Sequence, residues 1–134
     1  YVKKHSETIR SKGIEPILFM SWPYKNKPEM QEMLEKEFFK ASKLNNLRLI
    51  PAGQAFLYIN QNFPNINLYT KDLRHPSKEG TYLAALMVFT SLSNKSPIGN
   101  TYVMDLDPNI AKILQKAAWT TYKDFQERIV NSGL

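Results

Sequence analysis

The chain has 134 residues, and 43% of them are hydrophobic, so it has the size of one domain and enough apolar side chains for a sizeable core. It contains no run of about 18 apolar residues of the kind that spans a membrane. It has no cysteine, which excludes disulfides and thiolate metal sites, and its formal net charge is +6.

The positive net charge raises the question of a nucleic-acid partner. The lysines and arginines are spread along the chain, mostly on the polar faces of expected helices, and glutamates are interleaved with them. No cluster of about five or six basic residues occurs, and basic residues do not alternate with aromatic ones in the way that stacks bases. We therefore expect no nucleic-acid partner.

Residues 1–12 have apolar residues near a helical period, and Gly13 is suited to end such a helix. His5 lies on the polar, lysine-rich face of this helix, so a solvated histidine is expected there and not a ligand. The chain starts at Tyr1, inside this helical pattern. We expect either a processed product or part of a longer protein.

A short, continuous apolar run at 16–20 predicts the first strand, covered on both faces as in a parallel sheet. The loop 21–24 leaves the carboxyl end of that strand, where open α/β sheets bind their ligands. Its two aromatic residues, Trp22 and Tyr24, have two interpretations. They line a substrate groove, or they cover the edge of the sheet.

The second helix is predicted from Pro28, which suits a first helical turn, to the Asn45-Asn46 pair. Apolar residues follow at intervals of three and four and are expected to face the core: Met30, Met33, Leu34, Phe38, Ala41 and Leu44. The run 47–51 predicts a second strand. Two strands joined through a helix are parallel in nearly all known cases, so the sequence indicates an α/β fold.

The loop after the third helix carries the clearest chemistry. That helix is predicted at 54–63, and Pro64 ends it. An acid three residues before a histidine, as in Asp72 and His75, can hold one imidazole nitrogen and leave the other facing a cleft. Pro76 favours an extended His75 and itself suits the first turn of the next helix. This is the base half of a hydrolytic triad; the alternative is a helix N-terminal cap beside a surface imidazole.

The fourth predicted helix, at 80–92, is apolar on nearly all its sides, and a helix of this kind is buried. It would support His75 with the most deeply packed element of the chain. A last amphipathic helix is predicted to begin at Asp107-Pro108.

The passage 68–99 contains three motifs in order: Asp72-Leu73-Arg74-His75-Pro76-Ser77, Gly80-Thr81-Tyr82-Leu83-Ala84 and Lys95-Ser96-Pro97. It resembles the C-terminal block of the SGNH (GDSL-like) hydrolases, especially bacterial members with Asp-x-x-His-Pro-Ser before Gly-x-Tyr-Leu-Ala. The resemblance implies a three-layer α/β/α flavodoxin-like fold with a parallel sheet. Only two strands are evident, so the fold is expected to be incomplete, and residues 1–134 are expected to form the C-terminal part of one such domain.

In that family the histidine is the general base, the aspartate three residues earlier orients it, and a serine in an N-terminal Gly-Asp-Ser block is the nucleophile. By resemblance, His75 and Asp72 take the first two roles. No serine of this chain stands in a Gly-Asp-Ser or Gly-x-Ser-x-Gly setting, and Ser77 is expected to cap a helix. The nucleophile and the oxyanion-hole groups are therefore expected on a missing N-terminal segment, and the chain alone is expected to be inactive.

The resemblance implies a serine esterase, and in particular a carbohydrate acetylesterase, since many relatives deacetylate sugars. The expected partner is a small-molecule or carbohydrate ester contacted by Trp22, Tyr24 and Tyr69, with no cofactor and no membrane. Relatives are often exported, which favours a periplasmic or extracellular location. The alternative is a non-catalytic α/β module that binds a glycan or a protein through the same aromatic residues. No metal site is expected, because no paired-histidine spacing accompanies His5 and His75.

Overall fold

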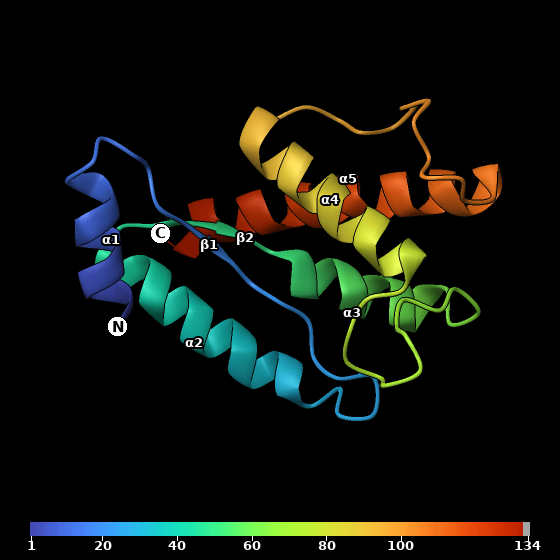
Figure 1. Cartoon of the computed structure of the whole chain (residues 1–134), viewed down its shortest axis with the longest axis horizontal. Helices are drawn as coiled ribbons and strands as arrows, with labels where there is room; N and C mark the ends of the chain where they lie inside the picture. The colour runs from blue at the N-terminus through green and yellow to red at the C-terminus, as the bar shows by residue number, and fades with distance from the viewer. Residues whose placement is uncertain (133–134) are drawn as a thin grey trace.

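The computed structural model describes residues 1–132, and Gly133 and Leu134, which the predicted domain includes, lie outside the described residues. Figure 1 shows the elements of the described part. In chain order they are α1 (Val2–Arg10), β1 (Ile17–Phe19), α2 (Met30–Asn45), β2 (Arg48–Ile50), α3 (Ala52–Asn62), α4 (Lys78–Ser93) and α5 (Pro108–Ser132). Each predicted helix and strand is present, with its ends shifted by at most a residue or two.

The two strands form a parallel pair, in which residues 17–19 face residues 48–50 in register. Beyond the strands, the N–H of Gly53 donates to the carbonyl oxygen of Met20 at 3.0 Å. A glycine is needed at this crossing, because a Cβ on Gly53 would lie 2.3 Å from the carbonyl oxygen of Ser21. The parallel pair, with α2 between its strands, confirms the predicted strand, helix, strand unit and the mixed α/β character of the chain.

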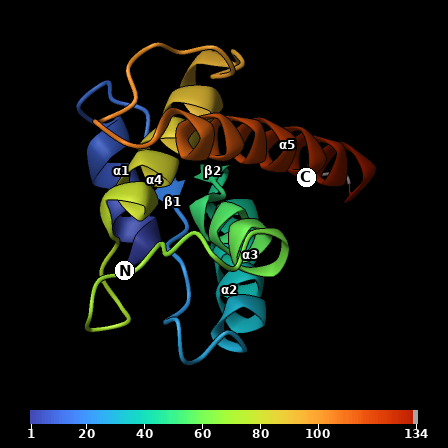
Figure 2. The same ribbon diagram turned by 90° about the vertical axis from the view of Figure 1, so that its right-hand side faces the viewer.

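The main core lies where α3, α4 and α5 pack on one another (Figures 1 and 2). Fully buried side chains come from all three helices: Phe56, Ile59, Leu83, Met87 and Leu114. A smaller cluster joins the end of β1, β2 and α5: Met20, Leu49 and Phe125. No helix among residues 1–132 is both long enough and apolar enough to cross a lipid bilayer.

The prediction that the fourth helix is buried on all sides is wrong. Leu83 and Met87 are buried, but Phe89 and Leu92 are 43% and 48% exposed, and Ala85 on the same side is exposed too. Elements of the described part, chiefly α3 and α5, cover only one face of α4. An apolar composition predicts that a helix needs cover, but it does not say which elements supply that cover.

Two other predictions of burial are wrong in part. In α2, Met33 is 59% exposed and Leu44 is exposed, whereas Leu34 and Phe38 are half-buried. In β1, Phe19 is exposed, so this strand is not covered on both faces. The physical reason is the width of the sheet, since two short strands cannot cover the 16 residues of α2.

Candidate functional site

The candidate site lies in the loop between α3 and α4, beside the loop that follows β1 (Figure 1). An antiparallel bridge joins Tyr69 to Pro76, and the N–H of Thr70 donates to the carbonyl oxygen of His75 at 2.9 Å. Residues 70–75 therefore form a closed turn that carries Asp72 and His75. Leu73 within this turn has a φ of 62°, in the left-handed region that non-glycine residues rarely adopt.

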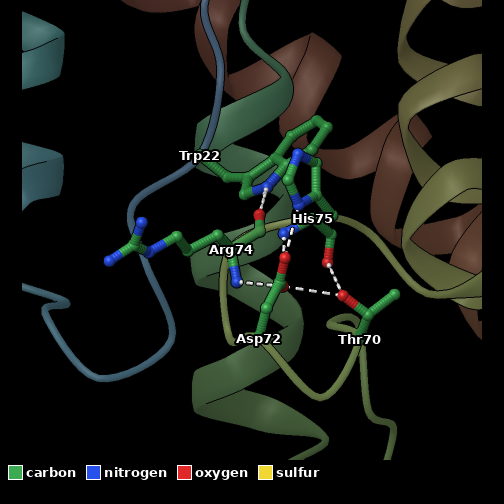
Figure 3. A network of polar contacts seen from close by, with 5 residues as sticks. All are labelled: Trp22, Thr70, Asp72, Arg74 and His75. Carbon is green, nitrogen blue, oxygen red and sulfur yellow. Dashed lines mark hydrogen bonds and ion pairs between the residues drawn. The ribbon is translucent and has the colours of Figure 1, made fainter.

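Asp72 points its carboxylate at the His75 ring, as Figure 3 shows. Oδ2 of Asp72 lies 2.5 Å from Nδ1 of His75. Oδ1 accepts from the N–H of Arg74 at 2.9 Å, from the N–H of His75 at 3.0 Å and from the Thr70 hydroxyl at 2.7 Å. The carboxylate is thus oriented by two main-chain and two side-chain donors, all within a single turn of the chain.

These contacts set the charge of the Asp72 carboxylate. The hydrogen bond to His75, followed by the main-chain N–H groups of Arg74 and His75 and by the Thr70 hydroxyl, holds the pKa of the Asp72 carboxyl well below its usual range. Because an ionised carboxylate only accepts hydrogen bonds, the proton of the neutral imidazole lies on Nδ1, and Nε2 carries a free lone pair. The His75 side chain is 78% exposed, so a reacting group can reach that lone pair. This geometry suits a general base.

The start of α4 fixes the other side of the turn. The hydroxyl of Ser77 accepts from the N–H of Gly80 at 3.1 Å, so Ser77 is the helix N-cap, as predicted. The alternative in which Asp72 caps this helix is therefore wrong. Pro76 precedes the cap and lies outside the first helical turn, in contrast to the prediction, because it pairs with Tyr69 instead.

Trp22 and Tyr24 both contact the turn that carries His75. The Trp22 indole stacks on Phe56, with ring centroids 4.2 Å apart, and its Nε1–H donates to the carbonyl oxygen of Arg74 at 3.0 Å. The guanidinium carbon of Arg74 lies over the Tyr24 ring, 4.9 Å from the ring centroid. Both aromatic side chains are half-buried beside the site. Contact between these two rings and a substrate stays a prediction.

Tyr69 is placed differently from the other two aromatic residues. Its side chain is almost fully buried, its hydroxyl donates to the carbonyl oxygen of Pro23 at 3.0 Å, and it accepts from Asn60 at 3.3 Å. Burial raises the pKa of this phenol. The predicted contact between Tyr69 and a ligand does not fit this position, because the ring faces the core. Tyr69 instead anchors the turn to the loop after β1.

Sequence reasoning missed Thr70, whose hydroxyl donates to Asp72. The signal was available, since threonine two residues from an aspartate often forms such local side-chain contacts. His5 is exposed on α1, as expected of a solvated histidine. In the part of the chain that the structure describes, no three histidine, aspartate or glutamate side chains gather as they would around a metal ion.

Comparison of the chain with models of protein families gave no match. Comparisons with curated proteins and with solved structures gave no match either. Function is therefore inferred from the geometry of the Asp72 and His75 pair and from the resemblance of the motif around it.

Proposed function

We propose that this chain carries the general base and the orienting acid of an SGNH-type serine esterase. The observation that carries the proposal is the contact of 2.5 Å between Oδ2 of Asp72 and Nδ1 of His75, on an imidazole that is open to solvent. A carboxylate in this place favours the Nδ1–H tautomer and stabilises the imidazolium that forms during acyl transfer. Both residues stand at the positions that the motif assigns to them.

In this mechanism Nε2 of His75 accepts the proton of a serine hydroxyl while the serine oxygen bonds to the ester carbonyl carbon. The imidazolium then gives the proton to the alcohol oxygen as its bond to that carbon breaks. Water attacks the acyl serine in the same way, with His75 as base, and releases the acid. Asp72 stays ionised throughout and keeps the ring in place.

The attacking serine must come from elsewhere in this proposal. Among residues 1–132 no serine hydroxyl is hydrogen-bonded to the His75 ring, and the nearest in sequence, Ser77, is occupied as a helix cap. A further segment or chain would supply the serine and the donors of the oxyanion hole.

The same segment would complete the sheet into a three-layer α/β/α, flavodoxin-like fold. Three features support this part of the proposal. The strands present are parallel, and α2 and α4 lie on opposite sides of them in the view of Figure 1. Exposed apolar side chains lie on β1 and α4, where added strands could cover them: Phe19, Phe89 and Leu92.

The proposed substrate is a small-molecule or carbohydrate ester, with an acetylated sugar as the first candidate. The half-buried rings of Trp22 and Tyr24 flank the turn that carries His75. Aromatic rings of this kind give an apolar wall for an acyl group or a sugar ring.

The test is hydrolysis of p-nitrophenyl acetate and of acetylated sugars by the chain produced within its complete reading frame. His75→Ala should lower kcat/KM by about 10³-fold or more, because the serine loses its base. His5→Ala removes an exposed histidine of α1 and should leave the rate unchanged. Undiminished turnover by His75→Ala would remove the proposal.

A second function, non-catalytic binding of a glycan or a protein through Trp22 and Tyr24, is favoured by the lack of a serine bonded to His75 within the described residues. This binding function would replace the esterase function if the complete protein hydrolyses no ester. Binding should then be lost in Tyr24→Ala and kept in His75→Ala, as measured by calorimetry with sugars. Equal binding by both variants would argue against this second function.

A further inference from the structure

Residues 22–25, here named the clasp, contact the turn 70–75 although about fifty residues separate them in the chain. The Trp22 Nε1–H donates to the carbonyl oxygen of Arg74 at 3.0 Å, and the main-chain N–H of Lys25 donates to the carbonyl oxygen of Leu73 at 2.9 Å. The two carbonyl groups belong to the two residues immediately before His75. The clasp thus holds the main chain at the point where the imidazole is attached.

These two carbonyl groups belong to the same peptide units that hold Asp72. The unit between Leu73 and Arg74 accepts from Lys25 and donates its N–H to Oδ1 of Asp72. The unit between Arg74 and His75 accepts from Trp22 and donates its N–H to the same oxygen. Each peptide plane is therefore fixed on its carbonyl side by the clasp and on its N–H side by the carboxylate. Figure 3 shows the bond from Trp22 to the Arg74 carbonyl.

The turn depends on such polar contacts, because it has little packing of its own. Residues 70–75 are all exposed, and Leu73 holds a left-handed conformation that side chains disfavour. Trp22, in contrast, is fixed by the core. Its indole lies parallel to the fully buried Phe56 ring, at an interplanar angle of 5°, and Phe19 meets its edge.

We propose that Trp22 is a positioning residue for His75. The indole of Trp22 is held by the core, and its N–H fixes the Arg74–His75 peptide in place. This peptide in turn fixes the contact between Asp72 and His75. This role differs from substrate contact and rests on the proposed function, since it concerns the same base. It requires the indole N–H, whereas contact with a substrate would require the ring surface.

The test compares Trp22→Phe, which keeps a ring on Phe56 and removes the N–H, with replacement of Trp22 by benzothienylalanine, which exchanges only the N–H for sulfur. Trp119→Phe on α5 is the control, since that indole stacks on Tyr122 away from the turn. The readout on the chain itself is the NMR signal of the His75 Nδ1 proton and of the ring nitrogens. Both Trp22 variants should move this signal upfield and speed its exchange with water, and the control should not.

In the complete protein, the same two variants should lower kcat about tenfold, the effect of losing one hydrogen bond, and leave KM within about twofold. A His75 signal that is unchanged in both variants would overturn the role of Trp22, whatever the activity. A raised KM with unchanged kcat would also overturn it and indicate substrate contact. If the complete protein hydrolyses no ester, the proposed function fails, and the NMR signal alone decides whether Trp22 positions the ring.

Discussion

Four donors converge on the carboxylate of Asp72, and each comes from a residue within three positions of it. The pKa of this carboxyl is lower in the folded chain than the usual value of about 3.9. Its ionised form therefore stabilises the folded state fully above that value, and the contribution is lost as pH falls through the lowered pKa of the folded state. The Asp72 carboxylate is thus ionised at neutral pH, and only strong acid protonates it.

Thr70→Val tests this account of the carboxylate. Valine keeps the shape of the side chain and removes the hydroxyl that donates to Oδ1 of Asp72 at 2.7 Å. The pKa of Asp72 should rise towards its usual range, as followed by the ¹³C shift of its carboxyl carbon during an acid titration. Thr8→Val, which removes a hydroxyl bonded within α1, is the control. An unmoved titration of Asp72 in Thr70→Val would contradict the role of the threonine.

The residues of the site differ in how far the sequence predicts them. The pairing of Asp72 and His75 was predictable, because they are only three positions apart in the chain and one turn brings them together. The bond from Trp22 to Arg74 was not, because it joins residues 52 positions apart and depends on where α3 places Phe56. Sequence reasoning therefore found Trp22 as an aromatic residue near the site and missed its hydrogen bond.

At the scale of the elements, the first turn of α4 contains one position, Gly80, that has no room for a side chain. A Cβ on Gly80 would lie 2.2 Å from the carbonyl oxygen of Leu68 and 3.1 Å from Cβ of Pro76. The first turn of α4 thus packs directly on the segment that leads into the turn with His75. This close approach explains why a glycine, a poor helix former, stands inside a helix.

Gly80→Ala should therefore destabilise the chain, although alanine favours a helix by about 1 kcal/mol. Forcing apart the start of α4 and the Leu68 carbonyl should lower the free energy of unfolding by about 1–3 kcal/mol. Urea unfolding followed by circular dichroism measures the difference. Thr81→Ala, at the next and exposed position of α4, should change stability by less than about 0.5 kcal/mol. A Gly80→Ala variant as stable as the original would show that the helix start can shift freely.

The ends of the helices were predictable because particular residues mark them. Asn46 and Asn94 follow α2 and α4 in the left-handed conformation, with φ of 49° and 57°, which asparagine tolerates better than most residues. The covered face of each helix was less predictable. Met33 and Phe89 belong to apolar stripes and yet are exposed, because periodicity identifies an apolar face but not the element that would pack on it.

Across the whole molecule, two clusters of buried side chains divide the core. The larger cluster lies among α3, α4 and α5, and the smaller one places Phe125 of α5 against Met20 and Leu49. Phe125 thus attaches the C-terminal half of the longest helix to β2 and to the residue that follows β1, and the Phe39 ring of α2 lies 5.6 Å from the Phe125 ring, measured between centroids. The position of the strands relative to the helices depends on this contact.

Phe125→Ala should lower the free energy of unfolding by about 3–5 kcal/mol, the usual cost of removing a fully buried phenylalanine. Val130→Ala, five residues later on the exposed face of α5, is the control and should cost less than about 0.5 kcal/mol. Both values follow from urea unfolding. Equal losses in the two variants would mean that the smaller cluster does not hold the strands to α5.

The Asp72 and His75 contact lies within one turn of the chain, and this has a consequence for thermal motion. Any motion of the turn that leaves its bonds to Trp22 and Lys25 intact carries acid and imidazole together, so their separation changes little. The distance from the imidazole to a group on another segment has no such protection. A reaction that uses this ring would therefore respond to temperature and solvent viscosity mainly through that second distance.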